Sequence, residues 1–334
     1  MSRRVTLRDV AMAAGVSRTT ASNVVMGTGR ISAETRERVR AAMVELGYVY
    51  HEAAGALRRK TSRSIGVVVT NIHRPHFGDL LLGLESTFTE AGYTSLVVST
   101  MDRLDRQQRA VSTLREHRVA GVALIPATGS GPELIDVLDA WEVPSLLVSR
   151  YIPGQERPYV GPDDVMGGRL AAEHLLDHGC RTIAYVGGWP EVASRRDRMR
   201  GMREAIAARG TDIELTDLAG EPSGDGGFEL GLAMIAAGGP LPDGVLCHGD
   251  AAAMGLARAL HDAGLAGRVR VIGYDGVAAA RYWIPSLTTV ETDGFDLGRQ
   301  AAEELVAALE HHRAPVSHLQ PPRLIVRESC GTHD

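Results

Sequence analysis

Apolar and polar positions near the start of the chain recur at the spacing of short helices. In residues 5–26, VTLRDVAMAAGVSRTTASNVVM, the apolar stripe of a first helix is formed by Leu7, Val10, Ala11 and Ala14. Gly15 suits the positive φ that ends a helix, and Val16 would fill the turn that follows. A third helix is predicted over ETRERVRAAMVEL, capped by Ser32. The pattern predicts a small three-helix unit.

The first two helices have the spacing of a helix-turn-helix. Thr6 is a plausible N-cap with Asp9 three residues on, and Ser17 is placed to cap the second helix. The polar face of that second helix carries Arg18, Thr19, Ser22 and Asn23. Arginine reads guanine and asparagine reads adenine in the major groove. Two amphipathic helices around a glycine also occur in proteins that never touch DNA, so the spacing alone leaves both interpretations open.

From Ser64 the pattern changes to apolar strands that alternate with amphipathic helices. The predicted strands cover 64–71, 94–100, 121–127, 143–149, 182–188, 213–218, 244–250, 269–276, 286–290 and 323–329. A second series of elements begins near Tyr159. Near-continuous apolar strands between helices indicate buried parallel sheets. The predicted fold class is therefore α/β, a two-lobed doubly wound parallel-sheet core with an N-terminal all-α head.

Ligands of open α/β sheets bind at the carboxyl ends of the strands. The predicted strand ends are Asn71, Ala127, Ser149–Arg150, Gly187–Trp189, Gly249–Asp250 and Tyr274–Asp275. We expect the ligand-binding residues of the core near these positions.

Charge is divided unevenly along the 334 residues. Residues 1–60 hold 11 basic and five acidic residues, whereas the remainder holds 25 basic and 36 acidic residues. A basic head on an acidic body indicates that only the head meets phosphate, although a solvated basic face would have the same composition.

The composition points to a protein of the cytoplasm. The start, MSRRVTLRDV, lacks the apolar segment of a signal peptide, and no apolar run reaches the length of a membrane-spanning helix. Cys180, Cys247 and Cys330 are few and far apart, so we expect neither disulfides nor a CxxC metal site. No cofactor and no metal are predicted.

Signals for an enzyme are weak. Gly187–Gly188 is not a dinucleotide-binding GxGxxG motif, and no GxxxxGK[ST] motif occurs. Asp163–Asp164 could suggest acid–base carboxylates, and Cys247–His248 a nucleophile pair. Adjacent residues on a strand point to opposite faces, so the second pair cannot cooperate directly. We therefore predict that the protein is not an enzyme.

Several motifs occur together along the chain. They are TLRDVAMAAGVSRTTASNVV, ISAETRERVRAAMVELGYV, ALRRKTSRSIGVVV, YVGPDDVMGGRLAAEHLLDHGC, ASRRDRMRGM, VIGYDGV and PSLTTV. On them the chain, from Val5 to about Arg327, resembles the lactose-repressor (LacI/GalR) family of transcription regulators. The resemblance implies a DNA-binding head, a hinge helix, and a core similar to periplasmic sugar-binding proteins. It also implies a homodimer on a near-palindromic operator, with a small-molecule effector between the lobes.

The resemblance implies domain boundaries and DNA-binding residues. The head would span 1–48, the hinge 49–63 and the core 64–334, with one lobe at about 64–160 and 291–320 and the other at about 161–290 and 321–330. The implied DNA-binding residues are Thr6, Ser17, Arg18, Thr19, Ser22, Asn23, Arg30, Ala54, Leu57 and Arg58. Leu57 matches the leucine that wedges into the minor groove, although it could also be an ordinary core leucine.

The resemblance also implies effector-binding residues in the core, namely Phe77, Arg150, Ser194, Arg198, Asp250 and Asp275. We expect Arg198 and Asp275 to lie on opposite lobes and to clamp a hydroxylated ligand. Alternatively, Asp275 caps its own turn, Arg198 forms a surface ion pair with Asp197 or Glu204, and Phe77 is core.

Three positions depart from the family pattern. Ser149, Gly249 and Thr292 stand where aspartate, asparagine and glutamine are common, and each loses a polar group that members use on sugars. We expect an unusual effector, with a carbohydrate favoured over a purine because Pro222 stands where an aromatic residue would stack.

The prediction is a sequence-specific DNA-binding regulator, most often a repressor in this family, under the control of a small-molecule effector. The alternative is a soluble sugar-binding or enzymatic α/β protein whose basic head binds a protein partner.

Overall fold

The structure, a computed structural model, describes residues 5–26, 28–48, 62–210 and 213–331. The chain forms two compact units, Met1–Ser62 and Arg63–Asp334, here called the head and the core. The hinge predicted at 49–63, with Ala54, Leu57 and Arg58, lies almost wholly outside the described residues.

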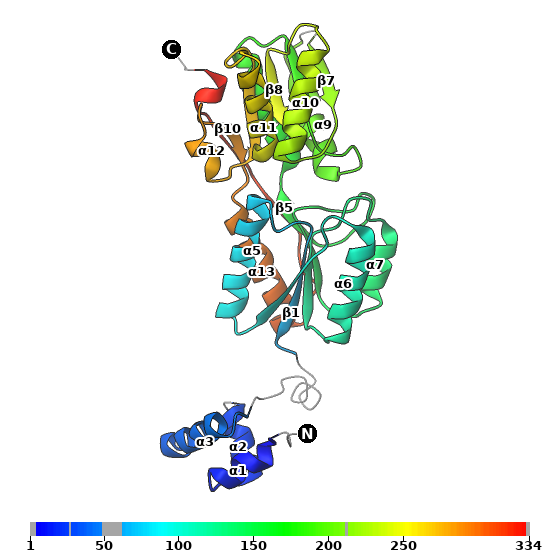
Figure 1. The fold of residues 1–334 in the computed structure, drawn as a ribbon. Helices are drawn as coiled ribbons and strands as arrows, with labels where there is room; N and C mark the ends of the chain where they lie inside the picture. Colours follow the sequence, from blue (N-terminus) through cyan, green and yellow to red (C-terminus); the bar gives the residue numbers. More distant parts are fainter. Residues whose placement is uncertain (1–4, 27, 49–61, 211–212, 332–334) are drawn as a thin grey trace. The chain divides into compact units, whose positions relative to one another are not determined.

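The described part of the head contains three helices, α1 (Leu7–Ala13), α2 (Arg18–Val25) and α3 (Ala33–Glu45) (Figure 1). Each begins at a hydroxyl residue, because the side chains of Thr6, Ser17 and Ser32 accept a hydrogen bond from a first-turn backbone N–H. The predicted capping box is present at α1, and Gly15 has the predicted positive φ of 64°. A core common to all three helices includes Val10, Ala14, Ala21, Val24, Val39 and Ala42.

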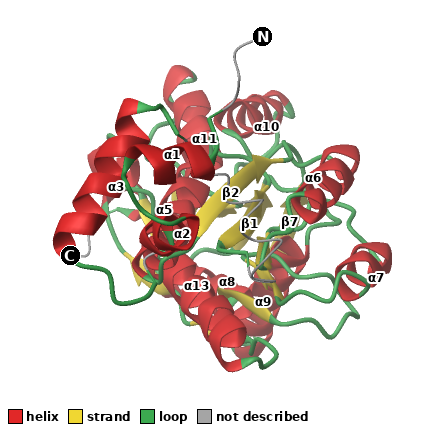
Figure 2. Ribbon diagram, turned by 90° about the horizontal axis from the view of Figure 1, so that it is seen from below, coloured by secondary structure: helices red, strands yellow, loops and turns green. Residues whose placement is uncertain are grey.

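The core contains two lobes, each built on a six-stranded sheet. The elements of the first lobe are β1 (Ser64–Val69), α5 (Pro75–Glu90), β2 (Thr94–Ser99), α6 (Leu104–Glu116), β3 (Gly121–Leu124), α7 (Pro132–Asp139), β4 (Ser145–Val148), β5 (Tyr159–Pro162), α13 (Gly294–His311) and β11 (His318–Gln320). Its strands are all parallel, in the order β11-β5-β4-β3-β1-β2. Helices α5 and α13 cover one face of this sheet, and α6 and α7 cover the other (Figure 2).

The second lobe repeats this arrangement. Its elements are α8 (Asp164–Asp177), β6 (Thr182–Val186), α9 (Ala193–Ala208), β7 (Glu214–Leu218), α10 (Gly224–Ala236), β8 (Gly244–Cys247), α11 (Asp250–Asp262), β9 (Arg270–Asp275), α12 (Ala279–Tyr282), β10 (Thr288–Glu291), β12 (Arg323–Ile325) and the short 3-10 helix η1 (Glu328–Cys330). The strand order is β12-β10-β9-β8-β6-β7, parallel except for the β10–β12 pair. The α/β class with two doubly wound lobes is therefore confirmed.

The chain passes between the lobes three times, after β5, after β10 and after β11. The interpretation that a second series begins near Tyr159 is wrong, because β5 pairs with β4 and β11 in the first sheet. The sequence also gave no signal for α12 or β11, which are only four and three residues long.

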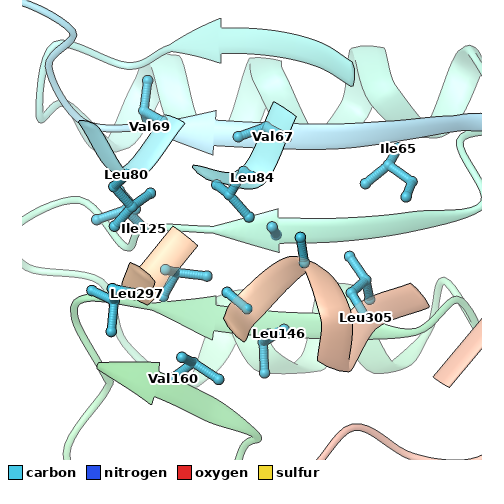
Figure 3. Close-up of a cluster of buried hydrophobic side chains, with 14 of the residues drawn as sticks. Ile65, Val67, Val69, Leu80, Leu84, Ile125, Leu146, Val160, Leu297 and Leu305 are labelled. Atoms are coloured by element: carbon cyan, nitrogen blue, oxygen red, sulfur yellow. The ribbon is translucent and has the colours of Figure 1, made fainter. Parts of the chain in front are cut away.

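A continuous apolar layer joins the first sheet to α5 and α13. Side chains from β1, such as Ile65, Val67 and Val69, face Leu80 and Leu84 of α5 and Leu297 and Leu305 of α13 (Figure 3). The two helices approach closely at glycines. A Cβ at Gly83 would lie 2.0 Å from the Phe295 carbonyl oxygen, and one at Gly298 would lie 2.0 Å from that of Leu80. Only glycine permits this spacing, which brings α13, far along the chain, into the first lobe.

Candidate functional site

The polar face of α2 is the candidate DNA-reading surface of the head. Arg18 and Thr19 are exposed, whereas Ser22 and Asn23 are half-buried. Ser17 accepts a hydrogen bond from the Thr20 backbone N–H at 3.0 Å, so its hydroxyl fixes the start of the helix. This cap positions the first turn of α2, and leaves the side chains of Arg18 and Thr19 free for a partner.

Two other predicted residues of the head have different surroundings. The Thr6 hydroxyl lies 2.6 Å from an oxygen of Asp9 within the capping box, while Arg30 is exposed in the loop before α3. The Asn23 side-chain nitrogen would lie 3.2 Å from a Cβ at Gly29, so Asn23 packs against the loop that follows α2.

A cavity of about 300 Å³ opens in the core, lined by residues of both lobes. It collects the carboxyl ends of the strands, as the fold class predicts. From the first lobe come Asn71, His73, Arg74, Pro75, His76, Phe77, Ser149, Arg150 and Pro162. From the second lobe and its connection come Ser194, Arg198, Glu221, Pro222, Ser223, Gly224, His248, Gly249, Ala251, Met254, Asp275, Val277, Ala279 and Thr292. Of the predicted strand ends, Ala127, Gly187–Trp189, Asp250 and Tyr274 are not among these residues.

Five of the six predicted effector residues line this cavity, namely Phe77, Arg150, Ser194, Arg198 and Asp275. Phe77 also belongs to the apolar core of the first lobe, as the alternative interpretation of this residue expects. Asp250 does not line the cavity. Its carboxylate is fully buried and accepts hydrogen bonds from the Thr289 hydroxyl at 2.6 Å and the Val277 backbone N–H at 2.8 Å.

These hydrogen bonds contradict the alternative in which Asp275 caps its own turn. Asp250, and not Asp275, holds the turn after β9, because it is Asp250 that accepts from the Val277 N–H. Burial, reinforced by the charge of Asp275, raises the pKa of Asp250 to about 8. The half-buried Asp275 is left facing the cavity, with a φ of 104° that few residues other than glycine adopt. Such strain at a cavity wall is typical of binding sites.

The expected clamp across the lobes is wrong. Arg198 lies on α9 and Asp275 ends β9, so both belong to the second lobe. The carboxylate partner of Arg198 is Asp164, whose Oδ1 accepts from Nε at 2.7 Å, and both side chains are buried. A surface pair with Asp197 or Glu204 is therefore excluded. Burial disfavours the charge of Arg198, but Asp164 raises the pKa of the guanidinium well above its ordinary value, and the group stays ionised.

Arg150 is held in the wall of the first lobe. Its Nη1 donates to Asp102 at 2.9 Å and approaches the Pro126 carbonyl oxygen and the Thr128 hydroxyl at 3.4 Å. Thr128 in turn donates to Asp102 from its backbone N–H and its hydroxyl. Burial opposes ionisation of Asp102, but Arg150 and Thr128 together lower the pKa of this carboxyl. The network fixes one positive charge at the cavity.

His248 also lines the cavity, and its ring nitrogen Nδ1 lies 2.9 Å from the Tyr185 hydroxyl. Burial lowers the pKa of His248 well below its ordinary value, and nearby guanidinium groups add to the effect, so the ring is neutral. Neighbouring Cys247 belongs to the apolar core instead, as strand alternation predicts.

The predicted effector residues did not include Arg74 and His248, which line the cavity, or Asp102 and Asp164, which bind two of its arginines. His248 directly follows β8, which is a usable signal, and Arg74 lies in the connection between β1 and α5. Asp102 and Asp164 act through the arginines that they bind, and no local pattern reveals such a pairing.

Among the described residues, no group of three or more histidine, cysteine, aspartate or glutamate side chains is arranged to hold a metal ion. Within the same part of the chain, no helix combines the length and apolar character needed to span a bilayer.

Comparison with known families matches both units. Residues 6–50 match the model for bacterial regulatory proteins of the lacI family, and residues 172–330 match a periplasmic binding protein-like domain.

Relatives and solved structures of similar length extend the match to nearly the whole chain. The chain is 30% identical to the transcriptional repressor PurR of Photobacterium profundum, over 97% of this chain and 98% of that protein. It is also 30% identical to the transcriptional regulator GalR of Escherichia coli, over 98% and 96%. The lac repressor dimer bound to operator and the anti-inducer ONPF superposes with a TM-score of 0.88 at 27% identity, over 99% of this chain and 100% of that one.

Proposed function

The chain belongs to the lacI family of bacterial regulatory proteins and is a DNA-binding repressor, and we propose that a small molecule in its core cavity controls its binding to operator DNA. The observation that carries this proposal is the cavity at the strand ends of both lobes, which presents polar groups with no partner among the described residues. The Asp275 carboxylate and the Ser194 hydroxyl are two of them.

In the proposed DNA interface, Arg18 and Thr19 read base edges from the first turn of α2, and Ser22 and Asn23 extend this surface. Thr6, Ser17 and Arg30 are proposed to meet the backbone, together with Ala54, Leu57 and Arg58, which lie outside the described residues. The support for Arg18 and Thr19 is their exposure at a well-capped helix start. We propose that a homodimer binds a near-palindrome, as a lac repressor dimer binds its operator. Such a regulator would act in the cytoplasm.

In the proposed effector site, Asp275 accepts from hydroxyl groups of a carbohydrate, while Ser194, Arg150 and Arg198 bind its oxygen atoms and Phe77 covers an apolar face. Lac repressor bound to ONPG and the CelR–cellobiose complex show carbohydrate-type ligands in similar structures. We assign Asp250 a positioning role, because it holds the turn that carries Asp275.

A gel-shift titration of the full chain against the DNA that flanks its own gene tests the proposal. We expect a saturable shift that survives excess random DNA, and a change in operator affinity when the matching sugar is added. Asp275→Asn should abolish the response to that sugar while leaving the shift without sugar intact. The proposal fails if cognate and random DNA compete equally.

A further inference from the structure

Arg74 differs from the buried arginines of the core. It is the N-cap residue of α5, is half-buried and lines the cavity. Arg150, Arg195 and Arg198 each have a carboxylate partner, in Asp102, Asp217 and Asp164. Within the described ranges, by contrast, no carboxylate lies within ion-pair distance of Arg74, and its guanidinium makes no hydrogen bond.

An unpaired guanidinium in this place is energetically unfavourable. A charge removed from water without a partner loses solvation that nothing replaces. Burial lowers the pKa of Arg74, and the positive charge of Arg150 lowers it further, against the more distant carboxylates of Asp102, Asp275 and Glu221. The first lobe therefore presents two guanidinium groups to the cavity, of which only Arg150 is neutralised by an ion pair.

The other side of the cavity has a different character. Glu221 and Asp275 line it, so the cavity is positive at the Arg74–Arg150 end and acidic on the second lobe. A neutral sugar satisfies the acidic groups through its hydroxyls but leaves Arg74 uncompensated. A bare inorganic anion pairs with Arg74 but gives Asp275 and Glu221 nothing to accept. A ligand that carries both an anionic group and hydroxyls satisfies both sides.

We propose that the effector is an anionic polyol, whose carboxylate or phosphate group binds Arg74 and Arg150 while its hydroxyls donate to Asp275 and Glu221. Guanidinium groups form bidentate hydrogen bonds with both carboxylates and phosphates. The proposed ligand class therefore comprises sugar acids and sugar phosphates. The inference rests on the proposed effector site and deepens it. In this proposal, Arg74 determines the preference of the site for anionic over neutral ligands.

Calorimetric titration of the full chain with matched probes tests this assignment. The probes are glucose, gluconate, glucose 6-phosphate, ribose and ribose 5-phosphate, with inorganic phosphate as the simple anion. The variants are Arg74→Gln, which keeps the length and removes the charge, and Arg109→Gln, which removes an exposed arginine of α6 outside the cavity.

We expect at least one anionic probe to bind at least tenfold more tightly than its neutral counterpart and than inorganic phosphate. Arg74→Gln should weaken that probe by about tenfold to a hundredfold and leave the neutral sugar unchanged, while Arg109→Gln binds as the natural chain does. The preference between gluconate and the phosphates identifies the anion. The inference is overturned if neutral sugars bind as tightly as anionic ones, if Arg74→Gln binds the anion unchanged, or if no probe shows binding that depends on Arg74.

Operator binding separates this inference from the proposed function. If the chain binds operator and a neutral sugar modulates it, the anionic ligand is wrong and the regulatory function stands. If anion binding depends on Arg74 but the chain does not bind operator specifically, the ligand assignment stands and the proposed function fails. Arg74→Gln should bind operator normally without ligand, since the Arg74 side chain makes no hydrogen bond or ion pair with the described residues.

Discussion

The guanidinium of Arg198 lies over the ring of Tyr274, with its Cζ 3.4 Å from the ring centre. The Tyr274 hydroxyl donates to Oδ1 of Asp164, the same oxygen that Nε of Arg198 reaches. Arg198 lines the cavity, and through Asp164 and Tyr274 it also connects α9 to α8 and β9. Its loss would alter the fold of the second lobe as well as ligand contacts.

Arg198→Ala should consequently destabilise the protein. It leaves the buried Asp164 carboxylate without its counter-charge, which typically costs about 3–5 kcal/mol of the free energy of unfolding. Adding Asp164→Asn to this variant should recover part of the loss, because the remaining group is neutral. Urea denaturation of the two variants measures both effects, and equal stability of the single and double variants would contradict the pairing.

Stability should also depend on pH through His248. Its pKa is lowered in the folded chain, so below about pH 6.5 the unfolded chain binds a proton that the folded one does not. Stability is therefore lost as pH falls below that value, by at most about 1.4 kcal/mol per pH unit from this group. The opposing charges around the ring are those of Arg198, Arg150, Arg74 and Arg195.

His248→Gln should flatten the pH profile of unfolding between about pH 6.5 and 5, relative to the natural chain. His261→Gln removes an exposed histidine outside this cavity and serves as the matched control. A profile that is equally steep in His248→Gln and in the natural chain would show that the ring is not held neutral.

The helix pair α5–α13 offers a test with a control in the same helix. Gly83→Ala places a methyl carbon 2.0 Å from the Phe295 carbonyl oxygen. The two helices must therefore separate, and part of the apolar layer must open. We expect a loss of several kcal/mol. Gly78→Ala meets nothing within 4 Å and should stabilise the chain by up to about 1 kcal/mol through helix propensity. Thermal unfolding compares the two, and similar midpoints would disprove the close contact.

Arg18→Ala should weaken specific DNA binding. Loss of a base-reading arginine costs about 1–3 kcal/mol on the cognate site and relaxes the preference at one base in each half-site. Folding of the head should be unaffected, because Arg18 is exposed. Gel shifts at two salt concentrations, with cognate and random DNA, measure the effect. An equal loss on both DNAs would assign Arg18 to the phosphate backbone.

Periodicity was sufficient to predict most of this fold. The capping residues of the head and the long apolar strands are local signals, and each led to an element close to its observed bounds. The strand β5 is different, because nothing in residues 159–162 says which of two sheets will accept them; pairing with β4 decides it. Short β11 likewise depends on an available edge beside β5.

For the cavity, the sequence predicted the strand ends but not which side chains pair with each other there. Arg198 and Asp275 follow from the family pattern, yet their location on one lobe depends on sheet order. Asp250 carries the same chemistry as Asp275 and lies beside another strand end, but hydrogen bonds from Thr289 and Val277 bury it. Whether a carboxylate faces a ligand or holds a turn is a tertiary property.

The second crossing between the lobes, after β10, has a consequence for how the protein is made. The first lobe starts at residue 64 but takes a helix of its apolar layer from 294–311 and its edge strand from 318–320. During synthesis, the elements α8 to β10 of the second lobe must be translated before the first lobe can complete its core. The apolar face of β1, β3 and β4 thus stays uncovered while more than a hundred further residues are translated. The nascent first lobe is therefore the folding intermediate that depends most on protection from aggregation.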